Sequence, residues 1–452
     1  MKDRPALRFL LRWTFRLGGL VIVVALATFL FLFRTALYHR FYLFPKQAQA
    51  WEQLRAQRMD VALDDGWNEY RGGLHCHSEL SHDSTITFPE IVEAAHQADI
   101  NFLFMADHCD GDQADFSKQW KGLHDGVLFI RGFEMGYGFM PWGLPDDTVL
   151  IKSTEPTFLA KQIRDKGGLL FIAHSEEPRE WQLLEINGME IYNLHTDFKG
   201  EEDQLFSMIP DFILSLRTYP DQLIRTIFDR QTDILKLWDE LNKGRKMVGM
   251  SANDAHRNTG FRGIYTADDK LRIMNTARDV VKEWPLNFWR RTLLRLVPGP
   301  LEMDREIFRI ELDPYERSLR FVNTHLLAKD LTEPDLVDAL RQGRAFVAFD
   351  MIADSRGFTF LAENSQGKAV MGESLPFEPG TKLKAGSPIS CRLTLMCDGN
   401  RVDDKTGNVV EFDAAKPGKY RIEADFNILG EWTPWVYTNP IEITAPSATP
   451  GG

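Results

Sequence analysis

Residues 74–84 read LHCHSELSHDS and place three histidines and two acidic residues within eleven positions. They directly follow the turn-like sequence RGG at 71–73. On a β-strand, His75 and His77 would point to the same face, about 7 Å apart along the chain, which is close enough to share an ion. The stretch therefore predicts either metal ligands at the end of a strand or a solvated polar loop.

Short apolar runs alternate with helix-like segments beyond residue 68, as strands and helices do in βα units. The runs are 101–108, 126–135, 168–174, 189–195 and 246–256. Because both faces of these runs are apolar, they predict a parallel sheet or barrel in an α/β fold. Six of the eleven histidines stand at or near the end of a run. In a barrel that end is the face where side chains from different strands meet, so the pattern favours one shared site.

The side chains at these strand ends are imidazoles and carboxylates, which bind Zn, Mn or Fe without thiolates. Several ions close together repel one another, and anionic ligands such as Asp83, Glu134 and Asp254 would offset that repulsion. Two or three ions in a cluster can hold phosphoryl oxygens and lower the pKa of bound water towards neutrality. The pattern therefore predicts hydrolysis by a multinuclear metal cluster and a metal-bound hydroxide.

Six short motifs occur in one order along the chain, and together they resemble the PHP (polymerase and histidinol phosphatase) superfamily of metal-dependent phosphoesterases. The motifs are HxHxxxSxD at 75–83, ADH at 106–108, FE at 133–134, AH at 173–174, YNLH at 192–195 and DAH at 254–256. The resemblance covers roughly residues 68–262. It implies a distorted (β/α)7 barrel and a site that holds two to three divalent metal ions.

Carried across residue by residue, the resemblance implies nine metal ligands. The first ion would be held by His75, His77, Glu134 and Asp254, the second by Glu134, His174 and His195, and the third by Asp83, His108 and His256. The family often has histidine at the position of Asp83, and aspartate is an accepted alternative. The catalytic residues would then be Glu134, Asp254 and His256.

Three further polar residues are candidates for contact with a substrate phosphate. His82 lies beside a predicted ligand and could touch the substrate or donate a proton, although a solvated loop histidine fits it equally well. Arg257 and Arg262 follow the last ligands and could bind phosphoryl oxygens. A surface salt bridge is the alternative for each arginine.

Residues 17–33 form an uncharged apolar run that is just long enough to span a bilayer as a helix. Five basic residues precede it, which predicts a cytoplasmic amino terminus and an extracytoplasmic, periplasmic catalytic domain. The run is long for a signal peptide and no clear cleavage site follows it, so an uncleaved anchor is favoured over a cleaved signal. Residues 1–46 would form the basic stub and anchor, and residues 47–67 a stalk.

The charge of the chain is divided unevenly. Its net charge is −12, while residues 1–46 contain eight Lys or Arg and only one Asp. An acidic body does not suit a nonspecific nucleic-acid binder, which needs cations to displace counterions. We therefore expect no nucleic acid as a partner. The expected partners are the membrane, through the amino-terminal helix, and a small-molecule or lipid- or saccharide-linked phosphoester. The sequence identifies no protein partner.

The remaining chain divides by pattern. Residues 68–264 form the predicted PHP-like domain, and 265–305 are predicted as a connecting helical segment. Strict alternation such as KYRIEADFNI at 419–428 predicts a β-sandwich-like domain over 306–445. The last residues, 446–452, are predicted to be disordered.

These expectations combine into a membrane-anchored metal-dependent phosphoesterase that acts on a phosphomonoester or a phosphodiester. One alternative is an amide or lactone hydrolase of the amidohydrolase type. A second alternative, from a different class, is a non-catalytic binding or scaffold module that metal ions stabilise at the membrane.

Overall fold

The structure is a computed structural model. It describes residues 5–61, 63–109, 111–194, 196–197, 208–258, 260–275, 280–288, 291–292, 303, 305–311 and 313–446. The contacts divide the chain into two units. One comprises Met1–Gln53 and Asp197–Asp229, and the other comprises Leu54–Thr196 and Arg230–Gly452.

The first unit is helical. Its helices are α1 (Pro5–Tyr38), the π-helix η1 (His39–Leu43), α2 (Phe44–Arg55, of which the last two residues fall in the second unit), α7 (Ile209–Ser215) and α8 (Pro220–Arg225). The side chains of η1 and α2 contact the segment that carries α7 and α8. The Nδ1 atom of His39 lies 2.8 Å from Oδ1 of Asp211, and the ring of Phe44 lies 6.2 Å from that of Tyr219.

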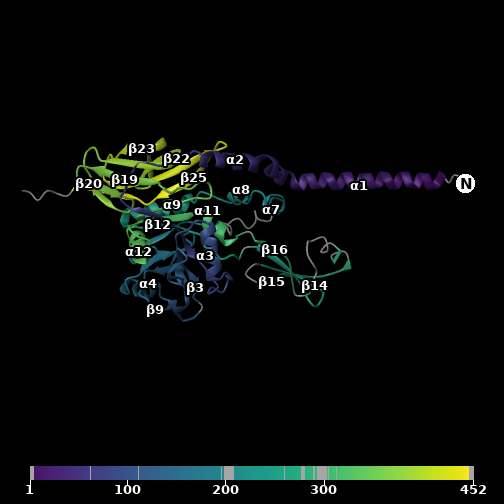
Figure 1. The fold of residues 1–452 in the computed structure, drawn as a ribbon, viewed down its shortest axis with the longest axis horizontal. Helices are drawn as coiled ribbons and strands as arrows, with labels where there is room; N and C mark the ends of the chain where they lie inside the picture. The colour runs from purple at the N-terminus through teal and green to yellow at the C-terminus, as the bar shows by residue number, and fades with distance from the viewer. Residues whose placement is uncertain are drawn as a thin grey trace, which may run out of the picture. The chain divides into compact units, whose positions relative to one another are not determined.

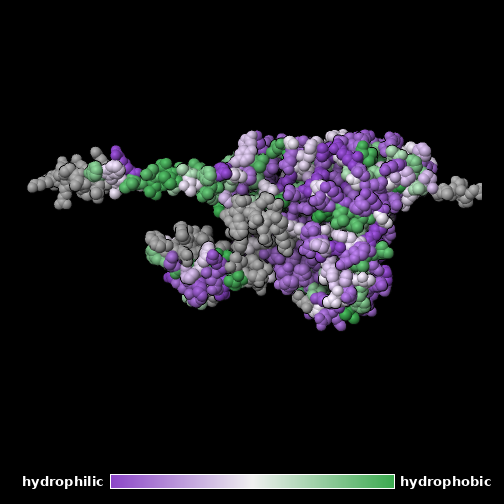
Figure 2. All heavy atoms as spheres, turned by 180° about the vertical axis from the view of Figure 1, so that it is seen from behind, coloured by the Kyte–Doolittle hydropathy of each residue, from purple (hydrophilic) through white to green (hydrophobic). Residues whose placement is uncertain are grey.

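The apolar run at 17–33 lies inside α1, and its side chains are almost all exposed (Figure 2). It contains no charge and no proline, so nothing interrupts the helix. Among the described residues, this is the one helix that is long and apolar enough to cross a membrane. A signal sequence near an amino terminus has the same length and composition.

The second unit begins with a parallel sheet built on β1 (Asn68–Cys76). β1 pairs in parallel with β2 (Phe102–Met105), and β2 pairs in parallel with β6 (Val127–Ile130), to which β5 (Gly122–His124) adds an antiparallel edge. Helix α3 (Phe88–Gln97) connects β1 to β2 and begins with a capping box between Thr87 and Glu90. The sequence RGG at 71–73 lies inside β1 and is not a turn.

The second sheet has the order β12-β11-β10-β8. Its strands are β8 (Phe139–Trp142), β10 (Leu169–Ile172), β11 (Gly188–Asn193) and β12 (Val248–Ala252). Helices α4 (Pro156–Asp165) and α9 (Thr232–Gly244) precede β10 and β12 (Figure 1). β10, β11 and β12 are parallel, whereas β8 is antiparallel to β10.

Isolated bridges connect the two sheets, from Cys76 to Ala255 and from Gly132 to Trp142. Within the described ranges no continuous ladder closes the strands into the expected (β/α)7 barrel. β8 runs against its neighbour, and register shifts interrupt the ladders of β1 and β11, which explains why the hydrogen bonding is not continuous. One core is nevertheless shared, because Phe104 of the first sheet and Phe171 and Met250 of the second belong to the same buried cluster.

Short elements surround the strand ends of this α/β part. They are β3 (Asp107–His108), β7 (Phe133–Glu134), β4 (Gln113–Asp115), β9 (Val149–Ile151), η2 (Phe116–Lys118) and η3 (Gly136–Gly138). β3 pairs in parallel with β7, so that His108 stands opposite Glu134.

Residues 260–311, part of which was predicted as a connecting helical segment, contain an antiparallel sheet instead. Its order is β15-β14-β13-β16. The strands are β13 (Gly260–Tyr265), β14 (Lys270–Asn275), β15 (Val280–Pro285) and β16 (Arg305–Glu311). Leu271 and Leu286 form a small buried cluster, against which Tyr265 and Ile273 pack. Most of the basic segment at 287–299 lies outside the described residues.

The carboxyl-terminal region is rich in strands but is not a separate sandwich. β17 (Asn323–Ala328) pairs with the free edge of β1, so the sheet continues from the α/β part through β18 and β25 to β20. The further elements are α11 (Tyr315–Phe321), α12 (Glu333–Gln342), β18 (Ala345–Ala348), β19 (Thr359–Asn364), β20 (Gly367–Val370), β21 (Ser374–Pro376), β22 (Lys382–Cys397), β23 (Asn400–Asp413), β24 (Gly418–Ile428), β25 (Glu431–Thr438) and β26 (Ile441–Thr444). Of the tail predicted to be disordered, 446–452, all residues after 446 lie outside the described residues.

Candidate metal centre

The predicted ligands stand where strands end. His75 and His77 are at the end of β1, and His108 and Glu134 close the paired strands β3 and β7. His174 follows β10, and Asp254 and His256 follow β12. These ends meet because Cys76 bridges to Ala255 and the main-chain N–H of His77 donates to the carbonyl of Ala255 at 3.1 Å.

The carboxylate of Glu134 lies between three imidazoles. Its Oε2 is 3.1 Å from Nε2 of His75 and 3.6 Å from Nδ1 of His108. Its Oε1 is 3.3 Å from Nε2 of His174. One carboxylate therefore presents its two oxygens to different partners, as a bridging ligand does.

Asp254 has a similar position between β1 and β10. Its Oδ1 lies 3.4 Å from Nε2 of both His75 and His77. Its Oδ2 lies 3.7 Å from Nε2 of His174.

A third group forms around Asp83. The Oδ2 atom of Asp83 lies 3.1 Å from Nε2 of His256 and 3.5 Å from Nε2 of His108. The rings of His77 and His256 stack with their centroids 3.7 Å apart. Asp83 comes from the loop after β1, so sequence-distant side chains close this side of the cluster.

Each of three overlapping groups has donor atoms within 4.8 Å of one another, as one metal ion requires. The groups are His75, His77 and Asp254; His75, Glu134 and His174; and His77, Asp83, His108 and His256. The structure thus brings together eight of the nine predicted ligands. The ninth, His195, lies outside the described residues.

The donors fit divalent ions. Nε2 of His77 and Oδ1 of Asp83 are buried and have no hydrogen-bond partner among the described residues. Buried polar atoms in that state cost free energy unless something binds them. A mixture of imidazoles and carboxylates suits Zn, Mn or Fe, so the residues present match the group that the resemblance implies.

The sequence of residues 73–245 matches the PHP domain family. Residues 73–245 form a PHP domain. The matched range ends before Asp254 and His256, which the geometry adds to the cluster. No curated protein matches the chain.

One solved structure that resembles the chain is a two-domain protein from Bacteroides vulgatus ATCC 8482, described as containing a predicted PHP-like metal-dependent phosphoesterase. It is 13% identical, with a TM-score of 0.38 over 85% of this chain and 98% of that chain. A TM-score of this size does not establish a shared fold, so the assignment depends on the family match.

Two acids of the cluster, Glu134 and Asp83, are held in the ionised form that metal binding requires. Burial alone would raise the pKa of Glu134, but the charge of His75 and the hydrogen bond from His174 outweigh burial and hold that pKa well below its usual value. The pKa of Asp83 is likewise lowered against burial by its hydrogen bonds with His108 and His256. Burial and the neighbouring His256 hold the pKa of His77 well below 6.5, which keeps its lone pair available.

Three of the predicted ligands have a left-handed backbone, with φ of 59° at His75, 50° at His174 and 46° at Asp254. This conformation costs on the order of 1–3 kcal/mol per residue and persists only where the surroundings enforce it. Such residues are concentrated at functional sites, and here all three point into one cluster.

Hydrogen bonds behind the ligands hold them in place. Ser81 Oγ lies 2.9 Å from Nδ1 of His77 and accepts the main-chain N–H of His108 at 2.9 Å. Asp107, buried beneath, accepts the main-chain N–H of Ser78 at 2.5 Å and the amide of Gln119 at 2.7 Å. The hydroxyl of Ser81 donates to Asp107 at 3.3 Å. Asp107 therefore orients His77 indirectly, through Ser81.

The predicted phosphate contacts lie in different places. His82 stays beside the cluster, with its ring 4.9 Å from that of His108. Arg257 instead forms salt bridges with Glu90 at 3.1 Å and Glu311 at 3.2 Å. Arg262 lies 4.0 Å from Glu306. Both arginines therefore make the salt bridges that were the alternative to phosphate binding.

Sequence reasoning missed Glu190, which is buried in β11 and lies 2.6 Å from Nδ1 of His75. The available signal was an acidic residue inside the apolar run MEIY at 189–192. Asn193, noted only as part of a motif, donates to Glu190 at 2.9 Å.

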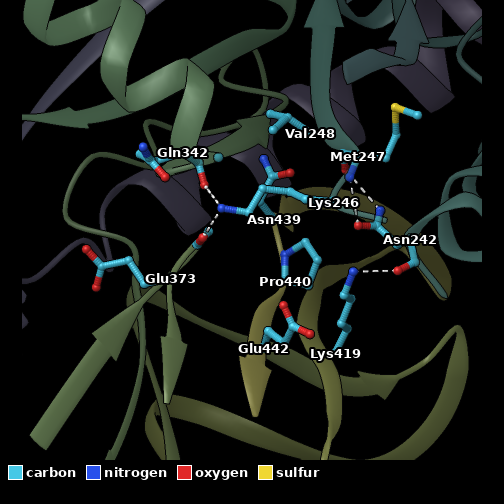
Figure 3. Close-up of a pocket in the computed structure, with 12 residues that line it drawn as sticks. Asn242, Lys246, Met247, Val248, Gln342, Glu373, Lys419, Asn439, Pro440 and Glu442 are labelled. Atoms are coloured by element: carbon cyan, nitrogen blue, oxygen red, sulfur yellow. Dashed lines mark hydrogen bonds between the residues drawn. The ribbon is translucent and has the colours of Figure 1, made fainter. Parts of the chain in front are cut away.

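A small cavity lies at the opposite, amino-terminal end of β12 (Figure 3). The cavity has a volume of about 20 Å³, which is room for about one water molecule. Lys246 donates to the carbonyls of Gln342 and Gly372 across it, and Lys419 donates to that of Asn242. These bonds join α9 and the start of β12 to the carboxyl-terminal region, so the residues around the cavity have a structural role.

Proposed function

We propose that the PHP domain hydrolyses a phosphate ester, either a phosphomonoester or a phosphodiester, with divalent metal ions. The observation that supports this most strongly is the convergence of eight predicted ligands into three overlapping groups. His75 belongs to two of these groups, and so does His77. Overlapping groups suit ions held close together, and neighbouring ions are suited to phosphoryl transfer.

The proposed metal ligands are the nine residues of the motifs, with His195 completing the group around Glu134 and His174. Two to three ions of Zn, Mn or Fe would be held. Bound there, they would supply polarisation of the phosphoryl oxygens and a lower pKa for a water nucleophile.

The protein residues have separate tasks in this proposal. Glu134 and Asp254 supply negative charge between the histidines, and His256 closes the group around Asp83. His82, at the edge of the cluster, is positioned to contact the substrate or to give a proton to the leaving oxygen. Arg257 and Arg262 are engaged with carboxylates, so we assign them no contact with phosphate.

We propose further that α1 anchors the chain in a membrane with the PHP domain, residues 68–264, on the extracytoplasmic side. Five basic residues precede the apolar run at 17–33 and favour a cytoplasmic amino terminus. They are Lys2, Arg4, Arg8, Arg12 and Arg16. A substrate near the membrane, such as a lipid- or saccharide-linked phosphoester, agrees with this location, as does a soluble small molecule.

The test combines elemental analysis of the purified full chain with a substrate panel. The panel contains a phosphomonoester, a phosphodiester, an amide and a lactone. We expect bound Zn, Mn or Fe and turnover of a phosphoester. Turnover of the amide or lactone alone would replace the proposal with an amidohydrolase activity, and bound metal without any turnover would favour a binding module.

The Asp254→Ala variant should lose bound metal and at least about 100-fold in turnover, because Asp254 lies within 3.7 Å of four predicted histidine ligands. His96→Gln is the matched control, since His96 is half-exposed and contacts Asp125 on the surface. It should behave as the wild type. Unchanged metal and turnover in Asp254→Ala would refute the ligand assignment.

A further inference from the structure

Glu190 is a charged residue in the middle of an apolar strand. Its side chain is 1% exposed, and its neighbours Met189 and Ile191 in β11 belong to the core. A buried carboxylate costs several kcal/mol unless hydrogen bonds compensate for the lost water. Its partners therefore show what the residue does.

Both oxygens of Glu190 are used. Oε1 accepts from Nδ1 of His75 at 2.6 Å. Oε2 accepts the main-chain N–H of His174 at 2.8 Å and the side-chain amide of Asn193 at 2.9 Å. The same amide of Asn193 lies 3.3 Å from Oδ2 of Asp254.

This one carboxylate thus reaches three ligands that come from three different strand ends. His75, His174 and Asp254 are also the three ligands with a left-handed backbone. A strained backbone persists only where contacts enforce it, and Glu190 supplies such a contact to the main-chain N–H of His174. Its contacts with His75, and through Asn193 with Asp254, are to the side chains.

The bond to His75 also decides which ring nitrogen faces the cluster. An ionised carboxylate only accepts hydrogen bonds, so Nδ1 of His75 is the donor. Nε2 is then left towards Glu134 and Asp254, at 3.1 and 3.4 Å. A histidine ligand whose second nitrogen donates to a carboxylate is oriented and made more basic in this way.

We infer that Glu190 is a positioning residue of the metal centre, which orients His75 directly, fixes the backbone of His174 and holds Asp254 through Asn193. The inference rests on the proposed metal-dependent function. It also predicts that a change at Glu190 weakens metal binding at only part of the cluster, because two of the three ligand groups contain His75. The group of His77, Asp83, His108 and His256 contains none of the three ligands that Glu190 holds.

The competing account is a purely structural role, in which Glu190 only keeps β10 and β11 in register. The two accounts differ in what a conservative variant changes. A positioning role affects metal affinity at particular groups, whereas a register role lowers stability and leaves the affinity of the folded protein unchanged.

The test uses the full chain in detergent, stripped with a chelator and titrated with Mn²⁺ by calorimetry. Glu190→Gln keeps the size of the side chain but turns one acceptor oxygen into a donor. We expect about 10–100-fold weaker binding of the ions that depend on His75. Binding to the group around Asp83 should keep the wild-type affinity, so the titration should separate into two steps.

Asp350→Asn is the matched control, since Asp350 is also a fully buried carboxylate but bonds to His325 and Ser355. It should lower the Tm and keep the wild-type Mn²⁺ affinity. Should Glu190→Gln fail to fold, Asn193→Ser removes the amide that joins Glu190 to Asp254 and leaves the bond from Glu190 to His75 in place. This variant should weaken Mn²⁺ binding several-fold. Wild-type affinity in every variant of these two residues that folds would overturn the inference.

Turnover of the phosphoester panel, measured separately, distinguishes this result from the proposed function. A wild-type chain that binds Mn²⁺ but hydrolyses no phosphoester would overturn the function and leave the role of Glu190 standing if its variant binds more weakly. A wild-type chain that binds no divalent ion would overturn both.

Discussion

At the scale of single residues, the ligand cluster depends on two carboxylates that several histidines share. Glu134 is the clearer case, because its oxygens lie within 3.6 Å of His75, His108 and His174. A residue in this position affects more than one ligand group at once.

Glu134→Gln should therefore release more than one ion per chain, while the folded state persists. The amide keeps the size of the side chain but lacks the charge that offsets repulsion between ions. Metal content after dialysis measures this, with the turnover rate expected to fall at least 100-fold. A variant that keeps the full metal content would show that Glu134 does not bridge.

A second charged group, outside the metal centre, makes stability depend on pH. His325 is fully buried and lies 2.8 Å from Asp350 and 2.6 Å from Glu69. Burial alone lowers the pKa of His325, but the charge of Asp350 and the hydrogen bonds to both acids outweigh it and raise the pKa to about 9. The folded protein thus keeps this proton at a pH where the unfolded chain releases it.

The stabilisation from His325 is complete below its ordinary pKa of 6.5 and is lost as the pH rises through about 9. Chemical unfolding in the presence of chelator at pH 6, 8 and 10 tests this. His325→Gln should cost about 3 kcal/mol at pH 6 and progressively less towards pH 10. A cost that does not change with pH would contradict the charged pair.

At the scale of elements, the glycines of β1 explain how the ligand-bearing strand fits between its neighbours. A Cβ at Gly72 would overlap the ring of Phe102 in β2, and one at Gly73 would contact Asn253 and Leu319. The sequence RGG suggested a turn, but these glycines permit close approach of buried elements instead.

Gly72→Val should therefore destabilise the fold by more than about 3 kcal/mol, because overpacking against Phe102 cannot be relieved at the flexible end of a side chain. Thermal unfolding measures the change. Gly66→Ala is the control, since nothing lies within 4 Å of its Cβ position, and its left-handed backbone (φ +79°) should cost only about 1 kcal/mol. Equal shifts in Tm for the two variants would contradict the packing argument.

A helix or strand could be predicted from the sequence where its capping residues and apolar pattern agree with the way it packs in the fold. α12 is the example: Thr332 accepts from the main chain of Asp335 at its start, and Gly343 ends it with φ of 72°. β24 shows the limit, because its alternation predicts a strand but does not show what covers its polar face. Arg421 and Asp425 are buried all the same, since Asp239 of α9 and other charged side chains pair with them.

At the scale of the whole molecule, the convergence of the site could be predicted but the course of the sheets could not. Polar residues at strand ends are a local signal and favoured one shared site, while the resemblance to the PHP superfamily placed His75 and Asp254 in one ligand group. The pairing of β1 with β17 joins residues some 250 positions apart. Nothing in either strand alone specifies that partner, so the carboxyl-terminal strands were wrongly expected to form a separate sandwich.

The division into units predicts where the chain can be shortened. Ala36, Phe44 and Trp51 are buried, while the apolar side chains of 17–33 are exposed. A chain that begins at residue 35 should therefore be soluble and retain full turnover, whereas a chain that begins at residue 47 should lose stability. Flotation with vesicles and thermal unfolding measure the two properties, and continued membrane association of the first chain would contradict a single anchor.

Anomalous X-ray diffraction of metal-loaded crystals shows whether side chains from separate strand ends bind a cluster of metal ions. We expect two or three anomalous peaks within binding distance of Glu134, Asp254 and Asp83, with one between His75 and His174. A well-ordered crystal grown with Mn²⁺ that shows no anomalous peak among these side chains would contradict such a cluster.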